Sequence, residues 1–248
     1  MASRRRRSRP TDPISDFPAW IAPQLTELVA KVPAGDEWAH EIKLDGYRMH
    51  ARTDRGQVQL LTRTGLDWTA KYTTTAAALQ GLPVQQAYID GELCAVSETG
   101  VTSFSLMQAA TDGRRTSALV FYAFEVLHLD GQNLMRDLLL ERKQRLQRLL
   151  NGYAGALRYC DHQIGMGPQF YEHACQLKLE GVVSKRLDAP YVPGNRGLWL
   201  KTKCVNREEF VVVGWTDPEG SRPRTGALLL AYYTSEGASR TPVAPERG

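Results

Sequence analysis

The sequence lacks the features that mark membrane, secreted and zinc-binding proteins. No apolar run among its 248 residues approaches the roughly 20 that cross a bilayer, and no apolar secretory signal opens the chain. Cysteine is scarce, and its spacing matches no set of metal ligands. We therefore predict a cytoplasmic protein without a membrane partner, a disulfide or zinc, in which all four cysteines are free: Cys94, Cys160, Cys175 and Cys204.

Excess charge is confined to the first residues of the chain. The net charge of +4 includes the arginines at 4–7 and 9, and without these five the chain holds 26 basic and 27 acidic residues. Crowded arginines repel one another and bury nothing, so residues 1–16 are predicted to form a disordered basic arm. Such an arm would add salt-sensitive affinity for DNA, or it is a solubilising tail or a misassigned start.

The sequence does contain an octapeptide whose side chains could take part in catalysis, Glu-Ile-Lys-Leu-Asp-Gly-Tyr-Arg at residues 41–48. Strand alternation would place Glu41, Lys43 and Asp45 on one face. A lysine held between carboxylates can serve as a covalent nucleophile if burial or neighbouring cations lower its pKa. Taken alone, the segment fits a half-buried strand with a surface ion pair better.

Four other segments change that interpretation. Lys-x-Asp-Gly-x-Arg resembles the adenylation motif of the covalent nucleotidyltransferases, namely ATP-dependent DNA ligases, RNA ligases and mRNA capping enzymes. Within this superfamily, the residues of these segments are similar to those of the ligase domain of bacterial non-homologous end-joining DNA ligases. The matching segments follow in the superfamily's order: Thr-Arg-Thr-Gly-Leu-Asp-Trp-Thr at 62–69, Asp-Gly-Glu-Leu at 90–93, Glu-Gly-Val-Val-Ser-Lys-Arg at 180–186 and Trp-Leu-Lys-Thr-Lys at 199–203.

The resemblance implies an α+β fold in two parts. Residues 17–204 would form an ATP-grasp-like nucleotidyltransferase (adenylation) domain of antiparallel sheets flanked by helices. Residues 205–248 would form an incomplete OB-fold domain, because the pattern predicts two strands there, at 209–215 and 227–233, and a last dozen residues without structure. Two strands cannot close the five-stranded OB barrel.

Hydrophobic periodicity predicts the elements of the larger part. In the predicted helix 137–150, leucines form an apolar stripe and the basic residues Arg142, Lys143, Arg145 and Arg148 are predicted to form its solvated face. Strands are expected at 37–44, 57–63, 87–96, 119–127, 181–185 and 198–203, and further helices at 24–31, 69–79 and 170–179.

The resemblance assigns roles around a bound ATP. Lys43 would be the nucleophile that takes AMP, Phe124 would stack on the adenine, and Glu41 occupies the position whose backbone reads the adenine edge. The family commonly has aspartate where this chain has Glu125. Arg48 and Arg63 match the arginines near the ribose and phosphate, or near the 5′ phosphate of a nick; arginine suits that place because it pairs with phosphate in a bidentate manner.

Acidic and basic residues complete the implied site. Glu92 matches a residue near the ribose that assists the metal, and Glu180 matches a ligand of that metal, Mg²⁺ or Mn²⁺. Strand alternation places Lys201 and Lys203 on one face, where two cations suit a polyphosphate whose charge grows at the leaving group.

The implied activity is an ATP-dependent DNA ligase of DNA repair. Its partners would be double-stranded DNA with nicks or ends and, as one candidate, a bacterial Ku-type end-binding protein at the nucleoid. Two alternatives stay open at this stage. Lys-x-Asp-Gly also occurs in RNA ligases and capping enzymes, and a truncated, catalytically weak remnant would merely bind nicked DNA or a repair partner.

Overall fold

The computed structural model describes residues 17–113, 115–194, 197–204, 211–216, 227–234 and 237–243. The chain divides into two compact units, Met1–Cys204 and Val205–Gly248. The predicted basic arm at 1–16 lies outside the described residues. Among the helices that are described, none has the length and apolar character needed to cross a membrane.

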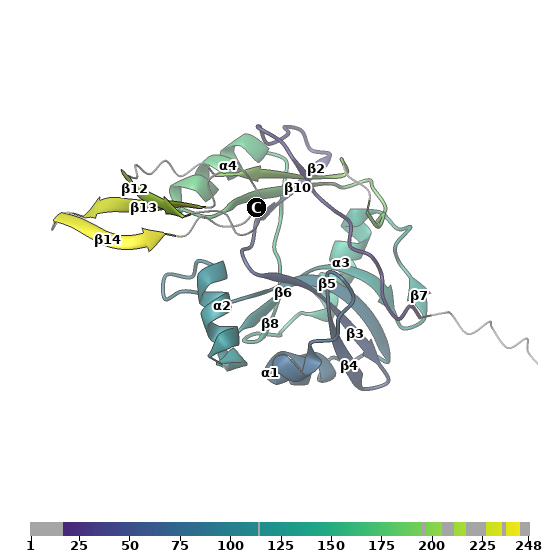
Figure 1. Ribbon diagram of the computed structural model, residues 1–248. Coiled ribbons are helices and arrows are strands. Elements are labelled where there is room, and N and C mark those ends of the chain that lie inside the picture. The colour runs from purple at the N-terminus through teal and green to yellow at the C-terminus, as the bar shows by residue number, and fades with distance from the viewer. Residues whose placement is uncertain are drawn as a thin grey trace, which may run out of the picture. The chain divides into compact units, whose positions relative to one another are not determined.

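One sheet of the first unit provides most of its core. Its strands follow the order β4-β3-β5-β6-β7, with β8 paired in parallel to β6. Helices α1 and α2 accompany this sheet (Figure 1). The elements are β3 (Tyr47–Asp54), β4 (Gln57–Thr62), η1 (Thr69–Lys71), α1 (Thr73–Gln80), β5 (Gln86–Cys94), α2 (Phe104–Asp112), η2 (Thr116–Ala118), β6 (Val120–Leu129), β7 (Gln132–Asn133) and β8 (Leu157–Tyr159).

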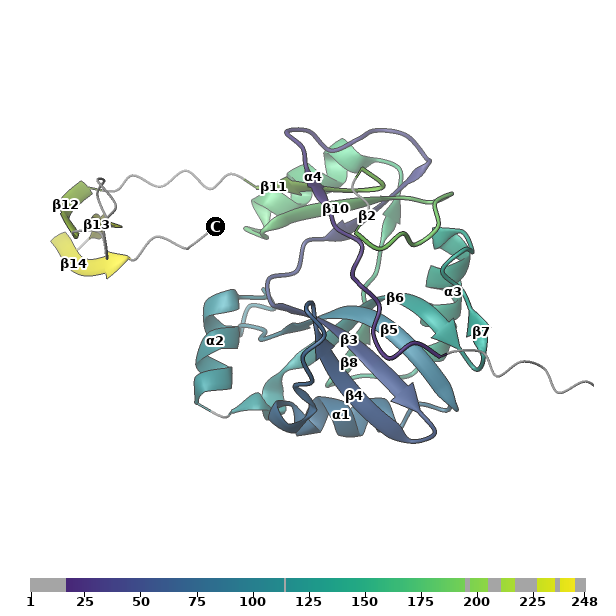
Figure 2. The ribbon, with the colours of Figure 1, turned by 45° about the vertical axis from the view of Figure 1, so that its right-hand side comes forward.

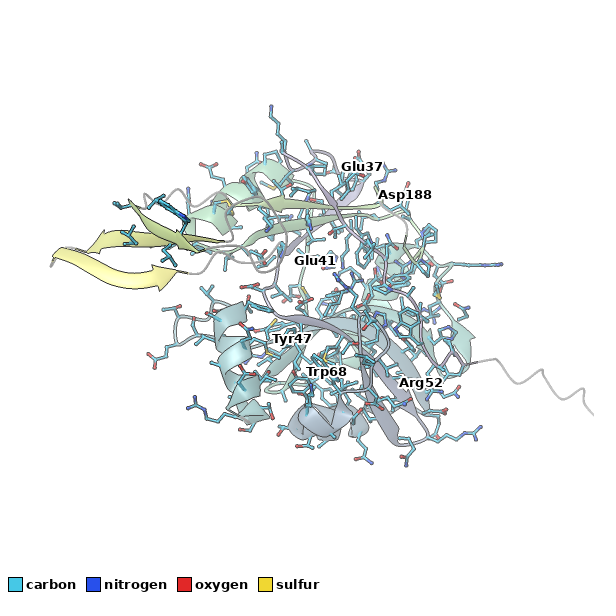
Figure 3. All side chains as sticks on the ribbon, in the orientation of Figure 1. Glu37, Glu41, Tyr47, Arg52, Trp68 and Asp188 are labelled. Atoms are coloured by element: carbon cyan, nitrogen blue, oxygen red, sulfur yellow. A yellow bond between two sulfur atoms is a disulfide. The ribbon has the colours of Figure 1, made fainter. Side chains whose placement is uncertain are left out.

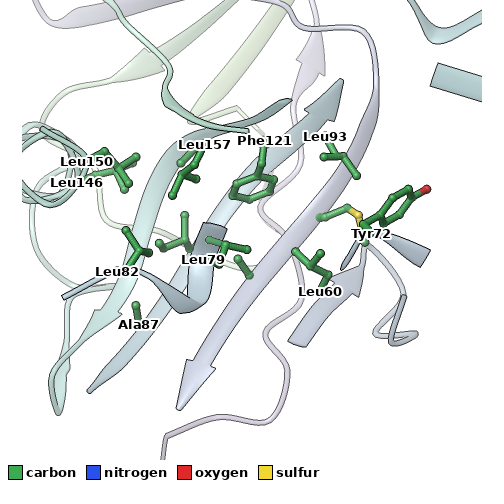
Figure 4. Packing of buried hydrophobic residues seen from close by; sticks show 14 of the residues in the cluster. Leu60, Tyr72, Leu79, Leu82, Ala87, Leu93, Phe121, Leu146, Leu150 and Leu157 are labelled. Atoms are coloured by element: carbon green, nitrogen blue, oxygen red, sulfur yellow. The ribbon is translucent and has the colours of Figure 1, made fainter. Parts of the chain in front are cut away.

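Apolar side chains from these strands and helices pack into one cluster. Leu79 of α1, Phe121 of β6 and Leu146 of the helix α3 (Leu139–Leu149) are among its fully buried members, and Figure 4 shows them converging. The central strand β5 is buried along most of its length. Gly91 permits this packing, because a Cβ there would lie 2.5 Å from the Phe121 ring.

A second sheet of the same unit holds the segments named by the later motifs. Its strand order is β1-β11-β10-β2-β9, and α4 (Gly167–Gln176) packs against it through Ala174 and Val182. Figure 2 shows this sheet above the first one. Its strands are β1 (Glu27–Leu28), β2 (Trp38–Ile42), β9 (Gln163–Ile164), β10 (Gly181–Arg186) and β11 (Trp199–Lys203).

The chain passes from β2 of one sheet to β3 of the other through residues 43–46. Gly46 lies so close to β5 that a Cβ would meet the Leu93 carbonyl oxygen at 2.3 Å. Another buried cluster, which includes Tyr88, Phe124 and Trp199, combines side chains from both sheets. The Lys-x-Asp-Gly segment is therefore the crossing between the two sheets.

The predicted α+β architecture of antiparallel sheets with flanking helices is confirmed for this unit. The helix predicted at 24–31 is wrong: this stretch is extended and includes β1. Gln24 explains the difference, because its N–H donates to the Tyr191 hydroxyl and its carbonyl accepts from Arg48. The bond to Arg48 uses the carbonyl that the first turn of a helix would need as an acceptor.

The second unit contains a three-stranded antiparallel sheet of β12 (Val211–Thr216), β13 (Ala227–Thr234) and β14 (Gly237–Val243). The first two strands were predicted, although residues 209–210 lie outside the described part. The prediction that the last dozen residues lack structure is wrong for β14, which pairs with β13 from Thr234↔Gly237 to Leu230↔Val243. An OB fold for this unit stays a prediction.

A disulfide corrects the prediction that all four cysteines are free. Cys175 of α4 and Cys204, directly after β11, are bonded, with their Cα atoms 5.3 Å apart. The two lie 29 residues apart in sequence and meet because β10 turns the chain back between α4 and β11. Spacing along the chain contains no signal for such a contact. Cys94 and Cys160 are free and buried.

Candidate active site

A cavity of about 230 Å³ lies within the first unit, lined by residues of both sheets. Seven of the nine predicted site residues line it, namely Glu41, Lys43, Arg48, Arg63, Glu92, Phe124 and Lys201, while Glu180 and Lys203 do not. The other lining residues are Thr26, Ile42, Leu44, Cys160, Val183, Lys185 and Trp199.

Lys43, Glu180 and Lys203 form a partly solvated group that we call the exposed cluster. Lys43 follows β2, and its N–H donates to the carbonyl of Gly181 at 2.9 Å. Its ammonium forms an ion pair with Glu180, whose other oxygen lies 4.0 Å from Lys203 Nζ. The side chains are 20% (Lys43), 27% (Glu180) and 57% (Lys203) exposed. Each side chain therefore keeps partial contact with water, although the Glu180 oxygen that faces Lys43 is itself enclosed.

Glu92 of β5 lies beside the exposed cluster but has the titration behaviour of a buried group. Burial raises its pKa to about 8, and the negative charges of Asp90 and Glu180 act in the same direction. Arg48 and Lys43 oppose the rise without cancelling it. A cation placed between Glu92 and Glu180 would relieve this penalty.

Arg48 is fixed in place by Asp90. Its Nε and one terminal nitrogen donate to the two Asp90 oxygens at 3.0 and 2.6 Å, and its other terminal nitrogen donates to the Gln24 carbonyl at 2.7 Å. Tyr191 also donates to Asp90, at 2.8 Å. Burial alone would raise the pKa of Asp90, but Arg48 and His50 outweigh it and lower that pKa. Arg48 thus enters the cavity with little freedom to move.

Glu41, Lys143 and Lys185 form a second group that we call the buried cluster. Glu41 Oε1 accepts from Lys143 Nζ at 2.6 Å, and Glu41 Oε2 lies 2.8 Å from Lys185 Nζ. All three side chains are at most 3% exposed, and Figure 3 shows Glu41 between the two sheets. The side chain of Glu41 is thus held by two cations.

The charges of the buried cluster are set by competition between burial and pairing. Burial opposes ionisation of Glu41, yet Lys143 and Lys185 together lower its pKa. Burial likewise disfavours a charged Lys143, but Glu41 holds the pKa of Lys143 above its ordinary value. For Lys185 burial dominates, and its pKa is lowered despite Glu41. One carboxylate is therefore shared unequally between two lysines.

Two aromatic rings flank the buried cluster at the cavity. Phe124 and Trp199 meet edge to face, with centroids 6.0 Å apart. Lys185 Nζ lies 4.3 Å from the Phe124 centroid and 4.2 Å from that of Trp199, and the Arg48 guanidinium lies 5.5 and 5.4 Å from the same centroids. Cations over aromatic faces are mutually stabilising, so the apolar wall and the charges hold each other in place.

The predicted solvated face of the helix 137–150 is wrong for two of its four members. Arg142 and Lys143 are completely buried, whereas Arg145 is only partly buried and Arg148 is exposed. Leu139, Arg142, Lys143 and Leu146 are spaced i, i+3, i+4 and i+7, which is one face of a helix. The spacing therefore contained the signal, and the charge of the side chains obscured it.

Arg142 also gives Glu125 a role. Its Nε and terminal nitrogen donate to the two oxygens of Glu125 at 2.8 and 3.1 Å, with no exposure on either side. The carboxylate after Phe124 in sequence thus points away from the cavity, toward α3. Sequence reasoning named neither this pair nor the cavity residues Lys185, Trp199 and Cys160 as functional.

The carboxylates suit a hard divalent cation. Among the described residues no group of three or more His, Cys, Asp or Glu side chains gathers as a metal site. Mg²⁺ usually takes one or two carboxylates and completes its shell with water and substrate phosphates. Glu92 and Glu180 match that two-carboxylate arrangement.

Comparison with known proteins identifies the family of the chain. Residues 19–203 match the family described as the ATP dependent DNA ligase domain. The chain is 41% identical over 221 residues to the multifunctional non-homologous end joining protein LigD of Pseudomonas aeruginosa, covering 89% of this chain and 26% of that protein. Against LigD of Mycolicibacterium smegmatis the identity is 40% over 224 residues, with 89% and 29% covered.

A solved structure agrees in fold. Mycobacterial DNA ligase D complexed with ATP and MES superposes with a TM-score of 0.68 at 32% identity, covering 88% of this chain and 70% of that one. The chain spans between a quarter and a third of the length of the two LigD proteins. With most of the motif residues gathered around one cavity, the chain belongs to the ATP-dependent DNA ligase domain family and is similar to the ligase domain of LigD.

Proposed function

We propose that this chain joins DNA strands in an ATP-dependent reaction whose intermediate is AMP bound to Lys43. The observation that carries the proposal is the position of Lys43, a partly exposed amine at a cavity that also presents Arg48, Lys201 and an aromatic wall. Cations there match the charge of a triphosphate, and Phe124 offers a surface for a purine. The family membership of the chain supports the same chemistry.

In the first step Lys43 would attack the α-phosphorus of ATP. The attack needs a neutral amine, so the ion pair with Glu180 must open and one proton must leave Lys43 Nζ. A P–N bond forms as the bond to the bridging oxygen breaks, and pyrophosphate departs with that electron pair. Lys201, which lines the cavity, and Lys203 would offset the charge that grows on the leaving group.

The later steps transfer AMP to DNA and seal the strand. A 5′ phosphate oxygen displaces Lys43 from phosphorus, giving DNA capped by AMP, and a 3′ hydroxyl then displaces AMP to form the phosphodiester. Arg63 stands exposed at the cavity, where a guanidinium can pair with a phosphate. Arg48, fixed by Asp90, provides a stationary positive charge.

Glu92 and Glu180 are the residues that would hold Mg²⁺ or Mn²⁺. When bound, such an ion neutralises phosphate charge and lowers the barrier to nucleotidyl transfer. The raised pKa of Glu92 supports this assignment, because burial disfavours its negative charge and a bound cation would compensate that charge.

We further propose a role in DNA repair by end joining, on double-stranded DNA with nicks or ends, in the cytoplasm at the bacterial nucleoid. The support is the similarity to proteins whose names specify non-homologous end joining. A bacterial Ku-type end-binding protein is the partner we propose on the same basis.

Two measurements test the proposal. Purified protein incubated with ATP and Mg²⁺ should gain the mass of one adenylyl group (AMP less one water), which peptide mapping should place on Lys43. Nicked duplexes with DNA or RNA strands, assayed in parallel, should show sealing of DNA. An AMP adduct with sealing confined to RNA would replace DNA ligase by RNA ligase, and the absence of any adduct would favour a DNA-binding remnant.

A further inference from the structure

We infer that Lys143 is a positioning residue for nucleotide binding, acting through Glu41 on Lys185 at the cavity. The inference rests on the proposed function, since it concerns the ATP that the cavity would take. Lys143 is absent from the cavity lining, so it does not touch a nucleotide there. Its influence passes through the side chain that it holds.

The contacts of Lys143 join three separate segments around the cavity. Its ammonium donates to Glu41 Oε1 at 2.6 Å, to the carbonyl of Phe124 at 3.3 Å and to the carbonyl of Cys160 at 3.3 Å. An ammonium has three N–H donors, and all three are used. Glu41, Phe124 and Cys160 each line the cavity, so one side chain of α3 fixes three parts of the wall.

The next contact extends this control to a second lysine. The Glu41 oxygen that Lys143 does not bond lies 2.8 Å from Lys185 Nζ. Lys185 lines the cavity and lies within 4.3 Å of the centroids of Phe124 and Trp199. Without Lys143, Glu41 would be free to turn fully to Lys185, and the peptides of Phe124 and Cys160 would lose their donor. The wall that a base would contact would then be less well ordered.

A neighbouring ion pair separates this role from mere stability. Arg142 precedes Lys143 on α3, is equally buried and pairs with a buried carboxylate, Glu125. Neither Arg142 nor Glu125 lines the cavity. A purely structural effect of α3 should therefore appear in Arg142→Met as well as in Lys143→Met, whereas a positioning effect should appear in Lys143→Met alone.

The experiment measures AMP transfer to Lys43 against ATP concentration in the full chain, below the melting temperature of every variant. Lys143→Met should raise the apparent KM for ATP by about tenfold or more while the maximal rate changes less than about threefold, because positioning is lost before the transition state. Arg142→Met and the exposed control Arg148→Met should leave KM unchanged. In a Glu41→Gln background, adding Lys143→Met should change KM by less than about twofold, since coupled residues are not additive.

Other outcomes would overturn the inference. An unchanged KM in Lys143→Met, an equal rise in Arg142→Met, or full additivity with Glu41→Gln would each reduce Lys143 to a structural residue. Should Lys143→Met fail to fold, Glu41→Gln alone is the test, and a wild-type KM there would sink the idea. If wild type forms no adduct, the proposed function fails instead, and calorimetric ATP binding by the same variants still decides the role of Lys143.

Discussion

The exposed cluster and the buried cluster flank one cavity with the same chemical groups and opposite surroundings. Each combines two lysines with one glutamate. Lys43, Glu180 and Lys203 are 20–57% exposed, whereas Glu41, Lys143 and Lys185 are at most 3% exposed. The same ingredients thus produce contacts that can exchange in one place and fixed contacts in the other.

The difference follows from the cost of separating charges. Near water, an ion pair contributes about 0–1 kcal/mol, so Lys43 can leave Glu180 at little cost. In the interior, removing one partner strands a charge and costs about 3–5 kcal/mol, so Glu41 stays where Lys143 and Lys185 place it. Covalent chemistry needs the first behaviour, and a wall of constant shape needs the second.

Replacing Lys43 should show the largest effect, on chemistry alone. Lys43→Ala should abolish AMP transfer, a loss of at least about a thousandfold, while the melting temperature stays within about 2 °C, because an exposed pair contributes little to stability. Mass spectrometry and circular dichroism provide the two measurements. AMP that persists on the Lys43→Ala protein would place the nucleophile elsewhere.

Replacing Arg142 should lower the stability of the protein and leave its chemistry unchanged. Arg142→Met leaves Glu125 buried without its partner and should lower the free energy of unfolding by about 3–5 kcal/mol. Arg145→Met, on the same helix but partly exposed, should cost less than about 1 kcal/mol. Urea denaturation checks both. Equal costs would mean that the contrast between buried and exposed pairs does not hold here.

The same contrast explains what could be predicted from the sequence. The exposed cluster was found because Lys43 and Glu180 lie in motifs that a resemblance can detect. Lys143 was assigned to solvent because a basic residue on a helix is usually exposed, although its i, i+4 relation to Leu139 placed it on the buried face. Local pattern showed the face, and only the position of Glu41 shows why a charge is tolerated there.

Contacts between distant segments were beyond local pattern altogether. The disulfide of Cys175 and Cys204 needs the turn through β10. The extended form of the stretch around Gln24 depends on Tyr191, 167 residues away. Strand β14 forms because β13 presents an edge to pair with. In each case the partner, and not the segment itself, decides the structure.

The disulfide next to the exposed cluster should contribute to the stability of the first unit. The Cys204 N–H donates to the carbonyl of Glu180 at 3.0 Å, and Lys203 is the preceding residue. Cys175→Ser should lower the free energy of unfolding by about 2–4 kcal/mol under oxidising conditions. With dithiothreitol present, wild type and variant should unfold alike. A difference that survives reduction would assign the effect to packing of the Cys175 side chain.

The smallest predicted effect concerns two glutamates of the same cavity whose pKa values shift in opposite directions. Glu41 has a lowered pKa, so its contribution to stability is present at neutral pH and is lost as acid protonates it. Glu92 has a pKa raised from 4.5 to about 8. Between these two values the folded chain binds more protons at Glu92 than the unfolded chain does, so the free energy of unfolding falls as pH rises.

Glu92→Gln should remove that fall, because the amide does not ionise. Thermal or urea unfolding is measured in EDTA, so that no divalent ion binds. Between pH 5 and pH 8.5 the free energy of unfolding of the variant should rise relative to that of wild type by at least about 1 kcal/mol, which is only part of what the full pKa shift would give. Glu141→Gln, an exposed glutamate of α3, should run parallel to wild type. If Glu92→Gln also runs parallel, Glu92 is ionised at neutral pH without a cation, and it belongs energetically with the solvated charges of the exposed cluster.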